Sequence, residues 1–297
     1  MRVLVTGASG FIGSHLFSVL ESKGHQVSRL SRSKSSDVPP AAPSDVVWAT
    51  TPTQSFSDFD AVVHLAGESI MGRWTPSKKA RILESRVTGT RNLAIALANA
   101  PKRPQCLIVA SAVGYYGPHG DESLTEDSSP GDDFLAQVGR QWEAAADPAR
   151  QAGIRTVHLR IGMVLSPDGG ALKQMLTPFR LGLGGRIGSG KQWMSWITLD
   201  DVIGAILYVL ENSALTGPVN LVAPNPVTNA EFTRALGRAL HRPTLFPMPA
   251  PIVKLIFGEM GEASLLSGQR VASVMLQSSG YKFKHIEIGE ALQSMVG

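Results

Sequence analysis

The chain has 297 residues, of which 43% are hydrophobic and 18% charged, a composition typical of one globular domain or of one domain with a smaller appendage. Its net charge of +4 is modest, and no dense Lys/Arg stripe is interleaved with aromatic residues, which argues against nucleic-acid binding. The single cysteine, Cys106, excludes an intramolecular disulfide and a cysteine-rich metal site, so we predict no metal centre.

Strands and helices alternate through the first two-thirds of the chain. Five apolar runs are predicted to be buried strands: Val3–Val5, Gln26–Leu30, Ala61–Leu65, Leu107–Ala110 and Thr156–Arg160. Helical patterns lie between them at Phe11–Lys23, Ser77–Ala98 and Phe134–Ala152, with room for one short strand near Val46–Trp48. This alternation predicts an α/β fold, in which a Rossmann-type doubly wound parallel sheet is covered on both faces.

The pattern changes after about Thr228, where helical segments are separated by proline and glycine. Further helices are predicted at Val202–Leu210, Ala230–Leu240, Pro249–Gly258 and Ile286–Met295, the first capped by Asp200 and Asp201 and the second by Asn229. We therefore predict a Rossmann domain over residues 1–165 and a substrate-side region over 166–297. The latter includes a small, mostly helical appendage from about residue 228, and Rossmann elements interleave with it around residues 195–225.

The first thirteen residues carry the strongest functional signal. The strand Val3–Val5 is followed by Gly7, Gly10 and Gly13 and then by an apolar-periodic helix. Glycines in such a turn let backbone amides approach a pyrophosphate at a helix N-terminus. Glycines also punctuate ordinary loops, but the flanking strand and helix favour a nucleotide site.

The end of the second predicted strand distinguishes the two nicotinamide cofactors. An acidic residue there would bind a ribose 2′-hydroxyl, whereas a basic one accommodates a 2′-phosphate. This chain has Ser31 and Arg32 at that point and no carboxylate nearby, which favours NADP(H). The alternative is a solvated charge at the start of a loop.

The strand Ala61–Leu65 ends in small residues that allow close backbone contact with a cofactor. Leu65, Ala66 and Gly67 are therefore candidate contacts. His64 lies within this apolar strand and is interpreted as a core residue without a catalytic role.

These segments together resemble the extended short-chain dehydrogenase/reductase superfamily. The resemblance narrows to an NAD(P)-dependent epimerase-like subfamily of NADP-dependent oxidoreductases with a C-terminal helical appendage. The motifs that carry it are found along nearly the whole chain: residues 6–13, 64–70, 85–93, 111–117, 178–185, 188–196 and 229–232.

The resemblance implies a role for each matching residue. It assigns the pyrophosphate to Gly7, Ser9, Gly10, Phe11, Ile12 and Gly13. Ser31 and Arg32 would hold the 2′-phosphate, and Leu65 and Ala66 the adenosine side. Arg86 matches a cofactor-contacting arginine, with Arg81, one turn earlier, as a second candidate; a solvated helix face is the alternative for Arg86. Residues from Ile161 to Val164 would run under the nicotinamide.

The superfamily's Tyr-x-x-x-Lys pair is missing. The tyrosine of this pair exchanges a proton with the substrate, and the lysine lowers its pKa and binds the nicotinamide ribose. Phe134 and Val138 stand at the expected places, and shifting the frame by one gives Leu135 and Gly139. None of these side chains can transfer a proton.

Three residues are candidates to replace the missing pair. Tyr116, or its neighbour Tyr115, offers a phenol, although either ring can equally pack under the following loop. Glu68 is a candidate acid or base, or else a solvated or helix-capping carboxylate. Ser111 is a candidate hydrogen-bond partner for a substrate oxygen, or a cap of its strand end.

A glycine-rich loop after residue 182 is a candidate substrate wall. Arg186, Lys191, Gln192 and Trp193 combine cationic, amide and aromatic groups that suit an anionic or ring-containing ligand. Such a loop can also be an interface or a lid.

Two functions fit these observations. The first is an NADP(H)-dependent oxidoreductase or epimerase-like enzyme with an altered catalytic set and an unknown small-molecule substrate. The second is a non-catalytic NADP(H)-binding regulator or redox sensor. We expect a cytoplasmic protein without a membrane or nucleic-acid partner, since no apolar segment could span a bilayer and no signal peptide precedes the first strand. The oligomeric state is not determined by the sequence. A homodimer is possible, because extended members of the superfamily are often dimers.

Overall fold

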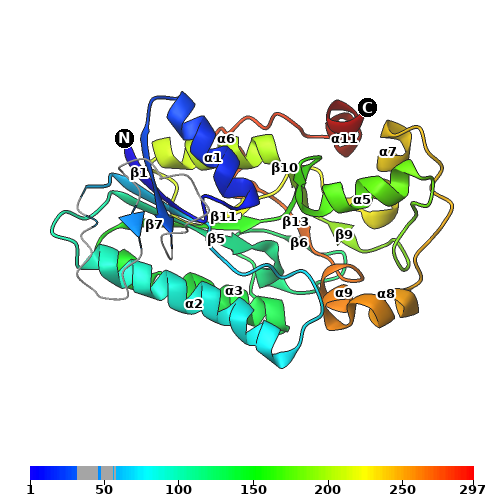
Figure 1. Cartoon of the computed structure of the whole chain (residues 1–297), viewed down its shortest axis with the longest axis horizontal. Coiled ribbons are helices and arrows are strands. Elements are labelled where there is room, and N and C mark those ends of the chain that lie inside the picture. The colour runs from blue at the N-terminus through cyan, green and yellow to red at the C-terminus, as the bar shows by residue number, and fades with distance from the viewer. Residues whose placement is uncertain (32–45, 48–55, 57) are drawn as a thin grey trace.

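The chain folds around a parallel sheet of seven strands. A computed structural model describes residues 1–31, 46–47, 56 and 58–297 (Figure 1). The strand order is β11-β7-β5-β4-β1-β2-β3, and every neighbouring pair is parallel. The strands are β1 (Arg2–Thr6), β2 (Gln26–Ser31), β3 (Val46–Val47), β4 (Ala61–His64), β5 (Cys106–Ala112), β7 (Arg155–Ile161) and β11 (Gly217–Leu221). The predicted α/β class and parallel sheet are confirmed.

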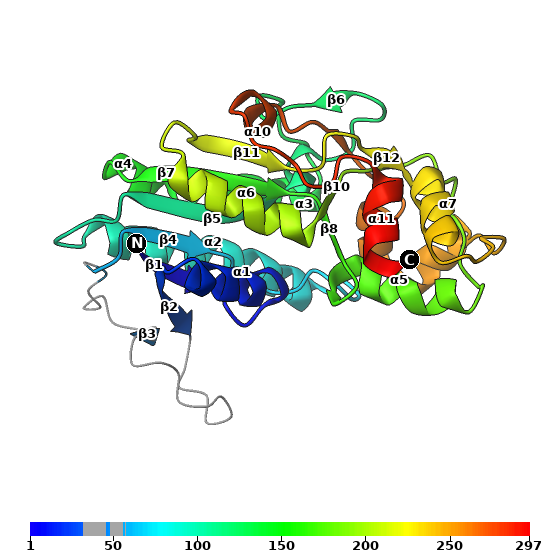
Figure 2. The same cartoon turned by 90° about the horizontal axis from the view of Figure 1, so that it is seen from above.

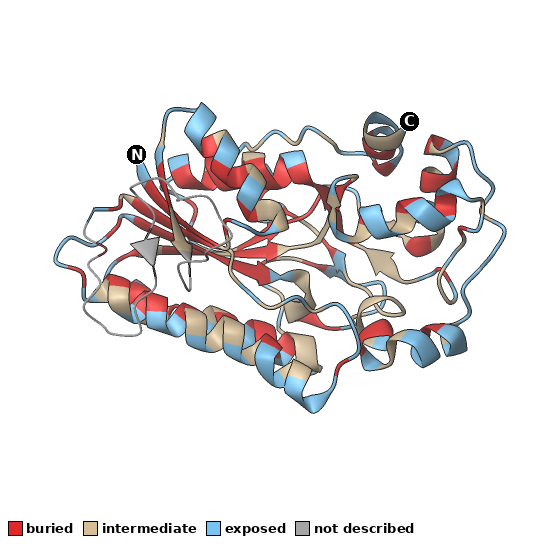
Figure 3. Cartoon of the chain, in the orientation of Figure 1, coloured by how far each residue is buried: buried red, intermediate tan, exposed pale blue. Residues whose placement is uncertain are grey.

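Side chains of the central strands alternate between two apolar layers. Val3 and Val5 of β1 pack with α1 (Phe11–Ser22) and α6 (Leu199–Glu211) on one face. Leu4 points to the other face, toward α2 (Pro76–Ala98), α3 (Phe134–Ala144) and α4 (Asp147–Gln151). Both faces are covered by helices, and the strands between them are mostly buried (Figures 1 and 3). This two-sided burial explains why the strands are nearly continuous apolar runs.

The predicted helix over Phe134–Ala152 is two helices in the structure. α3 ends at Ala144, and α4 begins at Asp147 with Pro148 in its first turn. Proline has no backbone N–H to donate, so it is tolerated in a first turn but interrupts a helix interior. The prediction was wrong here because the apolar period continues across the break.

The caps of two later helices also differ from the predictions. Thr198, not Asp200 or Asp201, is the N-cap of α6, and its side chain accepts a hydrogen bond from the Asp201 amide. The Asp201 carboxylate is buried and accepts from the backbone amides of Lys284 (2.7 Å) and His285 (3.0 Å). For α7 (Asn229–Ala239), the cap is Thr228, which forms a capping box with Glu231.

The last third of the chain adds small strands and helices at one end of the sheet (Figure 2). α7 and α11 pack together, and they share an apolar cluster with α5 and Trp196. The further elements are η1 (Val113–Tyr116), β6 (Ser123–Leu124), β8 (Met163–Ser166), α5 (Gly170–Arg180), β9 (Trp193–Met194), β10 (Trp196–Thr198), β12 (Val227–Thr228), α8 (Ala250–Phe257), α9 (Glu259–Ser264), β13 (Arg270–Val271), α10 (Val274–Ser278) and α11 (Ile288–Val296).

No helix among the described residues is both long enough and apolar enough to cross a membrane. Cys106 is buried in β5, and burial raises the pKa of its thiol to about 11. The domain boundary expected near residue 165 stays a prediction. One edge strand of the main sheet, β11, follows that residue in the chain and pairs with β7, as expected if Rossmann elements continue beyond it.

Candidate functional site

The glycine turn between β1 and α1 requires its glycines. Gly7 has φ +69°, and its carbonyl accepts a hydrogen bond from the Gly10 amide (2.9 Å). A Cβ on Gly7 would lie 2.8 Å from the Ala66 amide nitrogen, and one on Gly13 only 2.1 Å from the Gly7 carbonyl oxygen. These contacts leave no room for side chains, so the turn lies tightly between the ends of β1 and β4. Such a turn leaves the first amides of α1 free to bind a pyrophosphate.

Buried polar groups fix the end of β4 beside this turn. Thr6 Oγ1 accepts from the Ala66 amide (3.3 Å) and lies 2.6 Å from Nδ1 of His64. The other ring nitrogen of His64 lies 3.0 Å from Thr90 Oγ1, and burial lowers the pKa of this histidine to about 4. His64 is therefore neutral and holds the strand end in place, which agrees with its interpretation as a core residue.

Arg86 lies against the backbone that follows β4. Its Nη1 donates to the Glu68 carbonyl oxygen (2.9 Å), and its guanidinium lies 4.8 Å from the ring centroid of Trp142. A Cβ on Gly67 would be 3.4 Å from the guanidinium carbon. Burial lowers the pKa of Arg86 to about 10, so it stays cationic at neutral pH. The structure thus brings Leu65–Gly67 and Arg86 together beside the glycine turn.

The segment after β7 also reaches this turn. A Cβ on Gly169 or Gly170 would lie 2.4 or 3.2 Å from the ring of Phe11, and the latter would also approach the Val164 carbonyl. Val164 therefore lies near the first turn of α1, where Ser9 and Gly10 are exposed and Phe11 and Ile12 are half-buried. Ser31 ends β2 at the neighbouring strand. Arg32 lies outside the described residues, so its selection of NADP(H) stays a prediction.

Glu68 is held as an ion pair. Its carboxylate lies 2.7 Å from Lys78 Nζ and 3.7 Å from Arg81 Nε. The hydrogen bond and charge of Lys78 hold the pKa of this carboxyl below its usual range. Glu68 is therefore an anion at neutral pH and suits a base or an anchor better than an acid. Sequence reasoning missed Lys78, which belongs to no motif and only follows the Thr75 cap of α2.

Tyr116 is fully buried and has no contact with solvent. Its hydroxyl donates to Asn220 Oδ1 (2.7 Å) and accepts from Arg160 Nη1 (2.9 Å). Burial raises the pKa of this phenol to about 12, although the nearby Arg160 opposes the rise. A phenol in this position cannot reach a substrate, which contradicts the predicted proton transfer by Tyr116 and supports the alternative that its ring packs under the loop.

Ser111 belongs to the same buried network. Its hydroxyl donates to Glu143 Oε1 (2.8 Å), and Glu143 pairs with Arg160 through two contacts of 2.9 Å. Burial disfavours the charged form of Arg160, but the hydrogen bonds with Glu143 and the charge of that carboxylate raise the pKa of Arg160 above its ordinary value. Sequence reasoning missed Glu143 and Arg160. A charged residue inside the apolar run of β7 was the available signal, since such a charge needs a partner.

Tyr115 occupies a different position from its neighbour. Its ring is half-buried and carries the Arg160 guanidinium on one face, 3.6 Å from the ring centroid. A Cβ on Gly139 would lie 3.1 Å from Tyr115 Cα, and one on Gly114 would lie 3.3 Å from Leu135. Leu135 and Gly139 therefore contact η1. Phe134, Leu135 and Val138 also belong to an apolar cluster with residues of α2 and α9. Neither Phe134 and Val138 nor Leu135 and Gly139 can transfer a proton, so the assignment of the two positions of the pair stays a prediction.

The predicted substrate loop is anchored by two of its own residues. Gln192 Nε2 donates to the Ile187 carbonyl (3.0 Å) and the Leu265 carbonyl (2.8 Å), so its amide maintains the loop. Trp193 Nε1 donates to Asp121 (2.7 Å), and the Arg270 guanidinium lies 4.7 Å from its ring centroid. Arg186 and Lys191 are exposed. The structure does not bring these residues into contact with Glu68 or Ser111.

Comparisons with known proteins cover the whole chain. Residues 3–221 match the model of the NAD dependent epimerase/dehydratase family. The chain belongs to this family. Residues 248–295 match a domain of unknown function, DUF1731. Similar family members include the epimerase family protein Mb2239 of Mycobacterium bovis (44% identical over 98% of this chain and 96% of that protein). Epimerase family protein SDR39U1 of Bos taurus is 41% identical, and both chains are fully covered.

A solved structure of this family is similar over its full length. The crystal structure of human epimerase family protein SDR39U1 (isoform 2) with NADPH has a TM-score of 0.91 and 38% identity, covering 100% of this chain and 99% of that one. The predicted resemblance to extended dehydrogenases and reductases is thereby confirmed at the level of family and fold.

Proposed function

We propose that this chain is an NADP(H)-dependent oxidoreductase or epimerase-like enzyme with a small-molecule substrate. The observation that carries the proposal is the glycine turn, where Gly7 and Gly13 approach neighbouring backbone too closely for any side chain. Arg86 adds a half-buried cation beside the turn. These groups fit a dinucleotide pyrophosphate, and the human family member was crystallised with NADPH. Ser31 and Arg32 are proposed to select the 2′-phosphate.

Tyr115 is the side chain that we assign to proton transfer at the substrate. The bound cofactor would supply hydride transfer, and the protein must then hold or move the proton of a substrate hydroxyl or carbonyl. The Arg160 guanidinium lies on the ring face of Tyr115 and holds the ring in its half-buried position. Glu143 pairs with this guanidinium and accepts from Ser111, so it orients the arginine. Glu68, with Lys78, offers an ion pair near the cofactor for a polar substrate group.

A non-catalytic NADP(H)-binding regulator is the second candidate function. The observation that favours it is the missing Tyr-x-x-x-Lys pair, since the sequence has Phe134 and Val138, or one residue later Leu135 and Gly139, where the pair is expected. In this case the loop with Arg186, Lys191, Gln192 and Trp193 would be an interface and not a substrate wall. For either function we propose a cytoplasmic protein, because its cysteine is single and buried.

A titration followed by a turnover assay tests the proposal. NADPH and NADH binding are measured by fluorescence, and we expect NADPH to bind more tightly; tighter NADH binding would contradict the assignment. NADPH oxidation is then measured against a panel of aldehydes, ketones and sugar nucleotides. Turnover that disappears in Tyr115→Phe while NADPH affinity is retained supports the enzyme. Tight NADPH binding without turnover on any of these compounds supports the regulator.

A further inference from the structure

Large hydrophobic side chains are exposed together on one part of the surface. Of the thirteen exposed large hydrophobic residues among those described, eight lie in two short parts of the chain, residues 181–183 and 245–256. The most exposed are Leu245 and Leu255, each at 75%, and Leu181 at 69%. The eight residues, called here the apolar end, are Leu181, Leu183, Leu245, Phe246, Met248, Ile252, Leu255 and Ile256. A cluster of this kind is unusual on a monomer and marks a binding surface.

The segments of the apolar end adjoin one another. Arg242 Nε donates to the Arg180 carbonyl (2.8 Å), and the Phe246 amide donates to the Gly184 carbonyl (3.4 Å). Pro249 then leads directly into α8, of whose eight residues only Val253 is buried. The connection from α7 to α8 and the end of α5 lie at the extremity of the molecule away from the N-terminus (Figures 1 and 2). The apolar end is therefore free of cover by the rest of the described chain.

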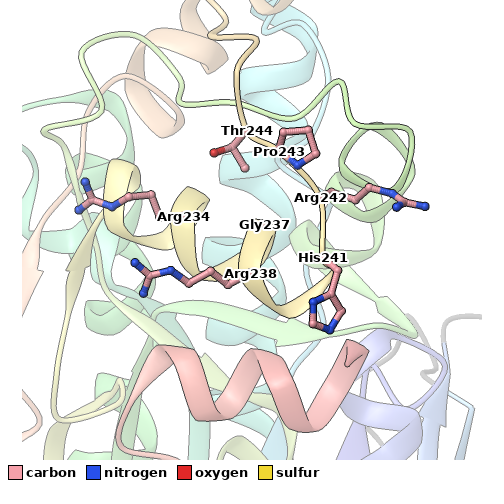
Figure 4. Close-up of a pocket in the computed structure, with 7 residues that line it drawn as sticks. All are labelled: Arg234, Gly237, Arg238, His241, Arg242, Pro243 and Thr244. Carbon is pink, nitrogen blue, oxygen red and sulfur yellow. The ribbon is translucent and has the colours of Figure 1, made fainter.

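A hollow of about 680 Å³ beside the apolar end is lined by cationic side chains. Its charged or titratable lining residues are Arg234, Arg238, His241 and Arg242, and no carboxylate lines it. None of the three arginines forms a direct ion pair with another described residue, although the charge of Arg234 helps to lower the pKa of Glu231 on the same helix. Arg234 and Arg238 extend to one side of the hollow and Arg242 to the other (Figure 4). The charges are thus spread over a surface and do not converge on a point, which does not suit a single phosphate group.

The sequence order of these residues shows what kind of partner fits. Cationic and exposed apolar residues are interleaved, as in Arg180–Leu181 and Arg242–Phe246. A protein interface usually has an apolar centre and a polar rim, whereas a lipid headgroup boundary accommodates cationic and apolar groups side by side. A second copy of the chain would present the same unpaired arginines. The nearby acidic residues Glu259 and Glu262 are already paired with Lys79 and Lys254.

We propose that the apolar end and the arginine-lined hollow form a docking surface for an anionic lipid bilayer. Leu245, Phe246 and Leu255 enter the headgroup boundary, and the arginines of the hollow attract the lipid phosphates. The protein is held at the surface and does not span the bilayer. This contact is distinct from the cofactor site, and it replaces the expectation that the chain has no membrane partner.

Vesicle flotation of the full chain tests the proposal. Vesicles of phosphatidylcholine alone are compared with vesicles that also contain phosphatidylglycerol. We expect binding to the anionic vesicles that weakens as salt is added. The double variant Arg234→Gln/Arg238→Gln should reduce the partition coefficient on the order of tenfold. Its control is Arg91→Gln/Arg140→Gln, which removes two exposed helix arginines elsewhere.

A second pair of variants tests the apolar contribution. Leu245→Ser/Phe246→Ser should lose most vesicle binding, whereas Met71→Ser/Ile95→Ser, two exposed apolar residues on other segments, should not. NADPH binding should be unchanged in all four variants, which shows that they are folded and separates this test from that of the cofactor site. Equal binding to neutral and anionic vesicles overturns the proposal. So does equal weakening in a control pair, or a dimer in sedimentation that Leu245→Ser/Phe246→Ser dissociates.

Discussion

Tyr115 of η1 packs directly against Gly139 of α3. A Cβ at Gly139 would lie 3.1 Å from Tyr115 Cα and 3.2 Å from its Cβ. Because Gly139 has no side chain, α3 leaves the space that Tyr115 of η1 occupies. No Tyr-x-x-x-Lys pair stands at the expected place in the sequence, yet a half-buried phenol lies at the carboxyl edge of the sheet, with Arg160 against its ring.

The two neighbouring tyrosines should respond differently to the same substitution. Tyr116→Phe removes a buried hydroxyl, leaves Asn220 Oδ1 without its donor and takes one of several hydrogen bonds from Arg160, so we expect a loss of about 1–3 kcal/mol in the free energy of unfolding. Tyr115→Phe removes a hydroxyl that has no hydrogen bond to the described residues and should change stability by less than about 0.5 kcal/mol. Urea denaturation measures both, and equal losses would contradict the assigned environments.

The glycine turn should not tolerate a methyl group. In Gly13→Ala the new Cβ would meet the Gly7 carbonyl at 2.1 Å, so the turn must open and NADPH binding should fall at least tenfold. Gly89→Ala in α2 is the matched control, because nothing lies within 4 Å of its built Cβ. Alanine there should stabilise the helix by about 0.5–1 kcal/mol. Fluorescence titration and thermal melting distinguish the two, and normal NADPH affinity in Gly13→Ala would refute the pyrophosphate assignment.

Glu68 should not behave as a general acid. The Lys78 ammonium lowers the pKa of this carboxyl, so the carboxylate form persists through the neutral range. An acid with a raised pKa would instead cause the rate to fall as pH increases through that pKa. We expect the rate profiles of wild type and Glu68→Gln to have the same shape between about pH 6 and 8. NADPH oxidation measured across this range checks the point, and an alkaline limb present only in wild type would restore Glu68 as the acid.

His64 should make the fold sensitive to acid. Its folded pKa of about 4 lies below the ordinary 6.5, so the unfolded chain binds the proton more readily. The stability is therefore complete above about pH 6.5 and falls by up to about 3 kcal/mol as pH approaches 4. Burial also lowers the pKa of His158, which adds to the same slope.

Substitution separates the contribution of His64 to this slope. His64→Gln should flatten the dependence of unfolding free energy on pH between about 4 and 6.5, whatever its effect on stability at neutral pH. His119→Gln serves as the control, because His119 lies in the loop after η1 and not inside the sheet. An unchanged slope in His64→Gln would show that the buried ring does not exclude the proton.

Local patterns predicted the fold well because the strands are buried on both faces. The run Val3–Val5 and the glycines after it specify strand, turn and helix within a few residues, and β1 and α1 are found there. The break between α3 and α4 was missed because the apolar period continues through Pro148. The cap of α6 was missed because Thr198 and Asp201 are both good capping residues, and only the distant C-terminal amides show which role Asp201 takes.

The candidate site was less predictable than the fold. The contacts of Arg86 with the segment after β4 follow from a motif, whereas the burial of Tyr116 depends on Arg160 and Asn220, which come from separate strands. No local pattern distinguishes Tyr115 from Tyr116. The two tyrosines differ only once η1 packs on α3, where Tyr115 lies against Gly139.

The buried carboxylate of Asp201 makes the two parts of the chain one folding unit. It lies in the first turn of α6, which covers the main sheet, yet its partners are backbone amides only a dozen residues from the C-terminus. A fragment that ends near residue 228 would remove these donors and would also expose the apolar cluster of α6 on which Leu276, Tyr281 and Phe283 pack. The gene should therefore not be divided for expression at residue 228, where the residue pattern changes. The N-terminal part needs the C-terminal segment to complete its hydrophobic core.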